Sequence, residues 1–350
     1  FSSTNRYPLR RKMLQGPNLR HSNMTPRTTR NMARAPRDTD DLTSVKALQR
    51  LRARERRYVA AAITELERLT PRAPQLLAAL QPYLGKALVI GFTGPPGAGK
   101  STLVNALIKV LRAKHKTVGV IAVDPSSPVS GGAILGDRIR MTAALDDDGV
   151  FVRSLASRGY LGGLSPAAVR IIDALDAAGY DIIILETVGT GQNEIDVAEV
   201  ADVRVVISAP GLGDDIQAMK SGLLEIADIL VVNKGDREGA ERTLLQLTGA
   251  LSIRAGAAAK VPVIKTTATS GEGVDTLLTA IERAGEGVSA IATSERRRRR
   301  ARYLIARAAG DLIAQRIRAG KGARLDLLAD EVLSGRTPVD VAAARILSDQ

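Results

Sequence analysis

The feature that most constrains this chain is an apolar segment that runs directly into a glycine-rich phosphate-binding motif. Residues 88–101 read LVIGFTGPPGAGKS, in which a strand-like run is followed by G-x-x-x-x-G-K-S. Glycines let the backbone amides turn toward an anion, and the helix that begins near Gly99 adds its positive dipole end. In such a motif the lysine contacts the β and γ phosphates and the serine hydroxyl ligates Mg²⁺. The motif therefore predicts a nucleoside triphosphate site at the carboxyl end of a strand.

The residues expected to hold the nucleotide phosphates follow from this motif. They are Gly94, Gly97, Ala98, Gly99, Lys100, Ser101 and Thr102. We expect Lys100 to serve catalysis as well, because its charge faces the transferred phosphate. The alternative is a glycine-rich turn without chemistry, and it is weakened by the strand before the motif and the amphipathic helix after it.

A second motif identifies the base of the nucleotide. Residues 229–232 form a buried-strand run, and Asn-Lys-Gly-Asp follows at 233–236. An aspartate at this edge accepts hydrogen bonds from guanine N1–H and N2–H, whereas adenine offers no matching pair. We therefore expect Asn233, Lys234 and Asp236 to bind guanine, and GTP to be preferred over ATP. The open alternative is an ordinary polar turn. Residues 266–270 are a weaker candidate for covering the base.

Carboxylates after other strand-like runs are candidates for the magnesium side of the site. Asp124 follows residues 118–123, Glu186 follows residues 181–185, and Asp137 lies in the segment LGDRIR. Because α/β proteins bind ligands at the carboxyl edge of a parallel sheet, we expect these oxygens to hold Mg²⁺ or to orient the attacking water. The alternative for each acid is a cap of the following helix.

Three long polar or glycine-rich loops follow strands, at residues 124–137, 186–196 and 210–222. Segments that order around a γ-phosphate and relax after hydrolysis are typical switches of GTPases. In the third loop, Lys220 stands near Asp214 and is a candidate cation for the charge that develops on the phosphates. The open alternative is a surface salt bridge worth less than about 1 kcal/mol.

Taken together, these motifs resemble those of the MeaB/ArgK GTPases, a family that includes the mitochondrial GTPase associated with methylmalonyl-CoA mutase. The matching segments are GPPGAGKS, VDPSSP, GDRIRM, ETVGTGQNE, GDDIQAMKSG and NKGD. The resemblance runs from about residue 42 to residue 349. One departure is Gly235, where many relatives carry alanine, and it changes no group that reads the base.

The resemblance implies a P-loop NTPase fold and a homodimeric chaperone. Such a chaperone uses GTP hydrolysis to gate adenosylcobalamin loading into an acyl-CoA mutase and to protect or reactivate that enzyme. It also implies that Lys100 and Ser101 serve phosphate and Mg²⁺, that Asp124, Asp137 and Glu186 serve the metal, and that Asn233 and Asp236 serve guanine. The competing hypothesis is a P-loop kinase that phosphorylates a transport protein or a small molecule. A kinase needs an acceptor pocket and a base near the γ-phosphate, and no motif outside the three loops offers either.

The composition narrows the classes of function. The chain has no cysteine and only two histidines, His21 and His115, so disulfides and thiolate metal sites are excluded and a nickel-handling GTPase is disfavoured. We expect His115 to be a solvated residue at a helix end. No D-x-H-x-x-G motif of a cobalamin-binding domain is present, so a partner must hold any cobalamin. No apolar run approaches the roughly 20 residues that cross a membrane.

The net charge of +13 is concentrated in two places. Residues 1–37 hold nine arginines and lysines and no acid, which predicts a disordered basic leader, with a mitochondrial transit peptide as the alternative. Residues 296–300 are five consecutive arginines, and we expect a solvated, partner-facing helix there. With aromatic residues at 3%, little can stack on bases, so no nucleic-acid partner is expected. The expected location is the bacterial cytoplasm, with the mitochondrial matrix as the alternative.

The order of apolar patterns predicts an α/β organisation. From residue 86 to about 285, strand-like and helix-like segments alternate, which indicates a mostly parallel sheet covered by helices on both faces. We expect a leader at 1–40, a helical segment at 41–85, a P-loop GTPase domain at 86–285, and a helical dimerisation arm at 286–350.

Overall fold

A seven-stranded sheet forms the centre of the chain, in the order β3-β2-β4-β1-β5-β6-β7. The computed structural model describes residues 41–124, 147–156, 166–187, 197, 199–211, 223–253, 261–289, 293–319 and 323–348. All six strand pairings within these residues are parallel. The strands are β1 (Leu88–Thr93), β2 (Val118–Asp124), β3 (Val150–Ala156), β4 (Ile182–Thr187), β5 (Val203–Ser208), β6 (Ile229–Val232) and β7 (Val263–Lys265).

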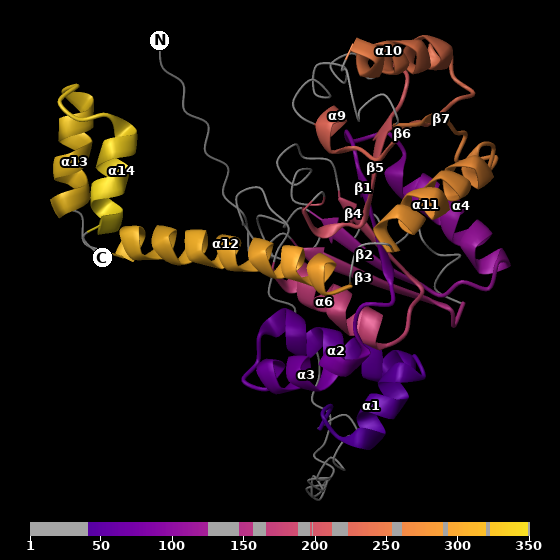
Figure 1. Cartoon of the computed structure of the whole chain (residues 1–350), viewed down its shortest axis with the longest axis horizontal. Helices are drawn as coiled ribbons and strands as arrows, with labels where there is room; N and C mark the ends of the chain where they lie inside the picture. Colours follow the sequence, from indigo (N-terminus) through magenta and orange to yellow (C-terminus); the bar gives the residue numbers. More distant parts are fainter. Residues whose placement is uncertain are drawn as a thin grey trace, which may run out of the picture. The chain divides into compact units, whose positions relative to one another are not determined.

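Helices cover both faces of this sheet (Figure 1). On one face α4 (Lys100–Ala113) and α11 (Val274–Ser289) pack together, and on the other α6 (Pro166–Ala177) lies against β2 and β4. Side chains alternate between the two cores, because Val89 belongs to the core with α6 and its neighbour Ile90 belongs to the core with α4. Both faces are therefore apolar, as expected for a parallel sheet, and the predicted fold class is confirmed.

Two strands that the sequence analysis did not single out carry charged side chains. Arg153 interrupts the apolar pattern of β3 and pairs with Glu67 of α2 (Arg56–Arg68). Arg204 interrupts β5 and pairs with Asp228, with 2.8 Å between Nη2 and Oδ1. Each arginine therefore pairs with an acid outside its own strand, Glu67 in α2 and Asp228 just before β6.

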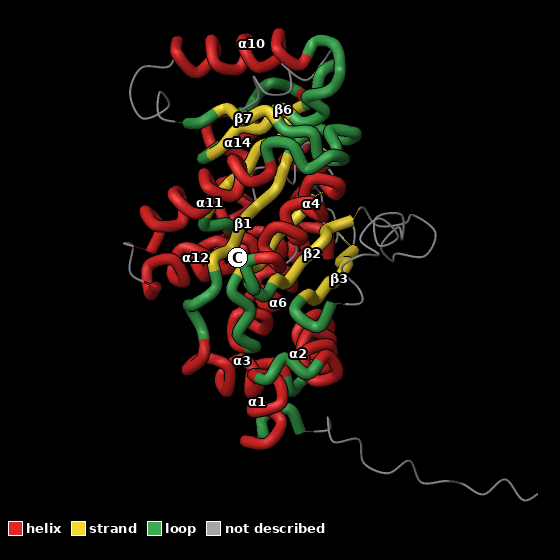
Figure 2. The backbone as a smooth tube through the Cα atoms, turned by 90° about the vertical axis from the view of Figure 1, so that its right-hand side faces the viewer, coloured by secondary structure: helices red, strands yellow, loops and turns green. Residues whose placement is uncertain are grey.

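The N-terminal helices form a small layer of their own beside α6. They are α1 (Val45–Arg52), α2, α3 (Ala73–Leu80) and the 3₁₀ turn Gln81–Tyr83. Figure 2 shows α1, α2 and α3 grouped near α6, and α2 and α3 both contact α6. The side chain of Asp176 on α6 accepts hydrogen bonds from the backbone amides of Gly85, Lys86 and Ala87, at 2.5, 3.0 and 2.9 Å. This carboxylate therefore fixes the chain where it leaves the helical segment and enters β1.

The remaining helices follow the sheet in sequence. They are α9 (Leu223–Ile226), α10 (Ala240–Ile253), α12 (Thr293–Ala319), α13 (Ala323–Leu333) and α14 (Val339–Ser348). Residues 334–338 separate α13 from α14. None of the helices in the described ranges has the length and apolar character required to span a bilayer.

The arginine run at the start of α12 differs from the solvated helix expected from the sequence. Arg300 is 5% exposed, and its Nη2 donates to the fully buried carboxylate of Asp202 at 2.8 Å. Arg296 donates to the same carboxylate at 3.2 Å, and so does the amide of Val89 at 3.0 Å. Arg298, by contrast, is exposed and pairs with Glu295. The run therefore attaches α12 to the amino ends of β1 and β5, because a buried charge must be paired.

This attachment predicts different costs for two arginines of one run. Arg300→Ala removes buried, charge-assisted hydrogen bonds and should lower the free energy of unfolding by about 2 kcal/mol. Arg298→Ala removes only an exposed pair and should change it by less than about 0.5 kcal/mol. Urea denaturation of both variants measures the difference, and equal effects would contradict the buried attachment.

Candidate functional site

The phosphate-binding motif forms the loop between the carboxyl end of β1 and the start of α4. Gly94 has a φ of 139°, and a Cβ there would lie 2.1 Å from the carbonyl oxygen of Ile207, so only glycine fits. Lys100 begins α4 and is 6% exposed. Its Nζ donates to the carbonyl oxygens of Gly94 and Pro95, at 2.8 and 2.9 Å. The ammonium group therefore lies within the loop, where the motif predicts nucleotide phosphates.

Ser101 and Glu186, both predicted for the metal side, lie together. The Ser101 hydroxyl donates to Oε1 of Glu186 at 2.5 Å, and both residues are buried. The sheet causes this proximity, because β4 pairs with β1 and Glu186 stands opposite Phe92. A hydroxyl and a carboxylate are hard oxygen donors of the kind that Mg²⁺ takes in nucleotide sites, so this pair fits the metal.

Three other predicted residues lie partly or wholly outside the described residues. Asp124 ends β2, beside β4, so its backbone lies at the same carboxyl edge of the sheet as Glu186. The side chain of Asp124 and the whole of Asp137 and Lys220 lie outside the described residues. The loops expected to act as switches lie largely outside them as well.

Asn233 joins the phosphate loop to the two loops expected at guanine. It directly follows β6 and is 1% exposed. Its Nδ2 donates to the carbonyl oxygens of Ala98 and Gly99, at 2.9 and 3.3 Å. Its Oδ1 accepts from the Thr266 hydroxyl and the Ala268 amide, both at 3.2 Å. Both ends of this amide thus bind protein groups. Asn233 therefore fixes the phosphate loop and the Thr266–Ala268 turn relative to each other.

The neighbours of Asn233 have the exposure that a base contact needs. Asp236 is exposed at the end of this loop, and Lys234 adopts a left-handed backbone with a φ of 57°.

Gly235, where many relatives carry alanine, lies close to the strand β7. Its amide donates to the carbonyl oxygen of Thr266 at 2.9 Å, and a Cβ on Gly235 would lie 2.8 Å from Cγ of Lys265. Alanine at position 235 therefore requires a shift of the flexible Lys265 stem and a small adjustment at the Thr266 carbonyl oxygen, 3.2 Å from that Cβ.

The Thr266–Ala268 turn has a larger part in this site than its sequence pattern indicates. The pattern at residues 266–270 is only a weak signal for covering the base. The structure brings Thr266 and Ala268 within hydrogen-bond distance of Asn233. The sequence signal that could have found this contact is the asparagine of the N-K-x-D box. A buried side-chain amide needs hydrogen-bond partners for both its oxygen and its nitrogen, and a neighbouring turn can supply them.

The sheet, the phosphate loop after β1 and the Asn-Lys-x-Asp box after β6 define the class: this is a P-loop GTPase. The comparison with protein families agrees. The profile of the family described as "Methylmalonyl Co-A mutase-associated GTPase MeaB" matches residues 59–322, and the chain belongs to this family. The matched range includes the phosphate loop, the guanine box and α12.

Individual relatives extend this finding. An archaeal protein from Pyrococcus horikoshii is 51% identical over 234 residues, which cover 66% of this chain and 74% of the relative. The mouse protein named "Methylmalonic aciduria type A homolog, mitochondrial" is 39% identical over 197 residues, covering 54% of this chain and 48% of its own. A solved structure of a protein called "LAO/AO transport system kinase" has a TM-score of 0.69 at 27% identity, and the match covers 87% of this chain and 96% of that one.

The position of Asp236 predicts selectivity for guanine. Asp236→Ala should weaken GTP binding by about 3 kcal/mol, or roughly a hundredfold, because the two hydrogen bonds that we expect this carboxylate to accept from guanine are lost. ATP binding should not improve. Glu238, an exposed acid two residues further on, provides the control, and Glu238→Ala should bind GTP like the wild type. Calorimetric titration measures both, and equal GTP affinity in the two variants would contradict this role of Asp236.

Proposed function

We propose that this GTPase gates adenosylcobalamin loading into a cobalamin-dependent acyl-CoA mutase, such as methylmalonyl-CoA mutase, and protects or reactivates that enzyme. The observation that carries the proposal is the family match over residues 59–322, whose description names the mutase. The name of the mouse relative supports the same metabolic context. Cobalamin stays with the mutase in this proposal, because the sequence has no D-x-H-x-x-G motif. A cytoplasmic location remains a prediction.

Within the site, we propose that Mg²⁺ is held by Ser101 and Glu186 together with Asp124 and Asp137. Bound there, the metal would neutralise charge on the β and γ phosphates. Support comes from the buried contact between Ser101 and Glu186 and from the end of β2 at the same sheet edge. Lys100 and Lys220 would add positive charge on the phosphate side.

A second candidate function is favoured only by the name of the similar solved protein, which is called a transport system kinase. Phosphate release from GTP without any acceptor supports the GTPase chaperone, and transfer of label to an added acceptor supports the kinase. We favour the chaperone, because the matched family is described as a mutase-associated GTPase.

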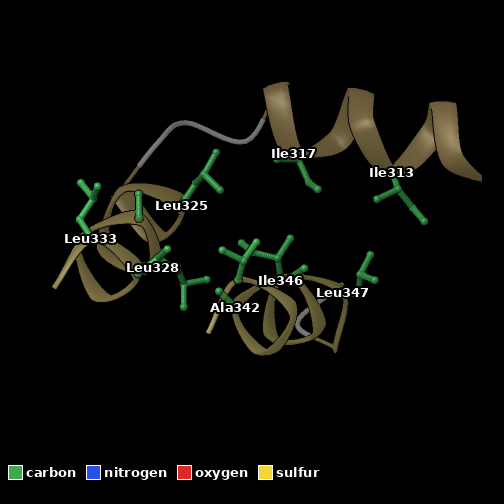
Figure 3. Close-up of a pocket in the computed structure, with 12 residues that line it drawn as sticks. Ile313, Ile317, Leu325, Leu328, Leu333, Ala342, Ile346 and Leu347 are labelled. Carbon is green, nitrogen blue, oxygen red and sulfur yellow. The ribbon is translucent and has the colours of Figure 1, made fainter. Parts of the chain in front are cut away.

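We further propose that the arm formed by α12, α13 and α14 binds a second copy of this chain. An apolar cavity of about 560 Å³ lies among these helices, and only aliphatic side chains line it (Figure 3). Leu333 and Val339 on its rim are 85% and 69% exposed. Burying such side chains in an interface is favourable at about 25 cal/mol per Å².

We propose the following domain organisation for the chain. Residues 41–85 are a helical layer, residues 86–285 are the GTPase domain and residues 286–350 are the arm.

The arm proposal predicts which exposed leucine matters for assembly. Leu333→Lys should shift the wild-type dimer to a monomer, because it places a charge in the apolar interface. Leu245 on α10 is 70% exposed and lies outside the arm, so Leu245→Lys should remain dimeric. Sedimentation velocity distinguishes the species. A monomeric wild type, or a dimeric Leu333→Lys variant, would contradict the proposal.

The chaperone proposal predicts that the mutase accelerates GTP turnover through the third loop. Lys220→Ala should keep the slow intrinsic turnover and lose most of the acceleration by saturating methylmalonyl-CoA mutase, because a cation in cis is removed. Lys114, at the end of α4 away from the phosphate loop, provides the control variant Lys114→Ala. If the wild type, Lys220→Ala and Lys114→Ala release phosphate at equal rates with the mutase, Lys220 has no role in the stimulation. If the mutase does not accelerate the wild type, the proposed partnership with the mutase is wrong.

A further inference from the structure

A second cavity, of about 560 Å³, lies where β2, β3 and β4 begin. This is the amino edge of the sheet, opposite to the carboxyl edge that carries the phosphate loop. The turn between α1 and α2 closes one side of the cavity, and the residues after α4 close another. None of the residues that line it belongs to the nucleotide site described above. The GTPase reaction therefore does not account for it.

The lining of this cavity holds more arginines than acids. It includes Arg54, Arg56 and Arg112, and the carboxylates of Glu55 and Asp148. Two of these charges are matched elsewhere. Arg112 forms a bidentate salt bridge with Asp147, with distances of 2.8 and 2.9 Å. Glu55 pairs with Arg50 at 3.2 Å. Arg54 and Arg56 then face Asp148 in the lining. Asp181 is also within electrostatic range of Arg54, and its Oδ2 accepts from the amide and the hydroxyl of Thr117, both at 2.7 Å.

Both of these arginines are held in place by backbone carbonyl groups. Arg54 donates one hydrogen bond through Nη1 to Gly179, at 3.1 Å. Arg56 donates through Nη2 to Val150 and Asp147, at 3.1 and 3.4 Å. A guanidinium group carries five N–H donors, so each arginine keeps donors beyond these bonds. Because the side chains are already fixed, binding a ligand costs them less conformational entropy.

Tyr180 adds a neutral donor to the same cavity. Burial raises the pKa of Tyr180 to about 12, while Arg54 and Arg56 act in the opposite direction. The phenol is therefore protonated at neutral pH. Tyr180 and the two arginines therefore give the lining three side chains that can donate hydrogen bonds.

The backbone at two positions of the lining is unusual. Arg54 and His115 both have a φ of 58°, in the left-handed region that glycine adopts most easily. Only four non-glycine residues in the described ranges have positive φ, and one of the others is Lys234 of the guanine box. Each of these two residues ends a helix, because the amides of Arg54 and His115 bond back to carbonyl groups of α1 and α4. Both helix ends therefore place a side chain in the lining of this cavity.

We propose that this cavity binds a small organic phosphate, of the diphosphate-ester class, at the same time as the phosphate loop binds its nucleotide. Guanidinium groups and a hydroxyl match phosphate oxygens in geometry and charge. The volume lies within the roughly 300–1,000 Å³ of small-molecule sites. A ligand here contacts the α1–α2 turn and the sheet edge at once, and so stabilises the N-terminal helices on the nucleotide domain.

The test uses the full chain saturated with GDP and Mg²⁺, so that the phosphate loop is filled, and inorganic pyrophosphate as the probe. Calorimetric titration should reveal one further binding equivalent. Arg54→Gln and Arg56→Gln should each weaken it at least tenfold, since glutamine keeps a donor for the carbonyl group but loses the charge. The matched control is Arg57→Gln, because Arg57 is exposed and does not line the cavity. This variant should bind like the wild type.

A second variant covers the case in which the glutamine variants do not fold. Tyr180→Phe removes only one hydroxyl and should weaken pyrophosphate severalfold, with an unchanged melting temperature. Absence of a further equivalent in the GDP-saturated protein would overturn the proposal. Equal weakening by Arg57→Gln would also overturn it, because that result indicates diffuse attraction to a basic chain. GTP turnover is read separately, so failure here leaves the GTPase assignment intact.

Discussion

The side-chain amide of Asn233 is the interaction on which the nucleotide site depends. It bonds to the phosphate loop through Ala98 and Gly99 and to the Thr266–Ala268 turn through its oxygen. Three loops that are far apart in sequence thereby acquire one fixed geometry. Gly99 shows how close this packing is, because a Cβ there would lie 2.5 Å from Nδ2 of Asn233. Fixed donors of this kind bind a nucleotide without losing much entropy on binding.

The two edges of the sheet carry different groups of functional and structural residues. The carboxyl edge carries Lys100, Ser101, Glu186 and Asn233, as expected for an open parallel sheet. At the amino edge, buried carboxylates attach the helical additions: Asp202 accepts from the arginines of α12, and Asp176 accepts from the amides that lead into β1. Changes at one edge should therefore affect nucleotide chemistry, and changes at the other should affect the attachment of helices.

Much of this arrangement could be predicted from the sequence, because strong local patterns specify it. The strand and glycine loop before Lys100, and the strand before Asn233, predicted the sheet edge and the nucleotide class. Pairings between distant residues could not be predicted. The arginines at 296–300 were expected in solvent, since a charge run usually is solvated, and only tertiary contact with Asp202 explains their burial. The strands β3 and β5 were not singled out, because Arg153 and Arg204 obscure their apolar pattern.

GTP hydrolysis at the loop that holds Lys100 is the activity on which the proposed chaperone function depends. The most direct measurement is phosphate release from GTP and from ATP at equal concentrations, by the wild type and by Lys100→Ala, with no acceptor present. We expect release from GTP by the wild type, much slower release from ATP, and loss of GTP turnover in Lys100→Ala, because the charge proposed to face the β and γ phosphates is removed. Undiminished GTP turnover by Lys100→Ala, or equal use of ATP by the wild type, would contradict this activity.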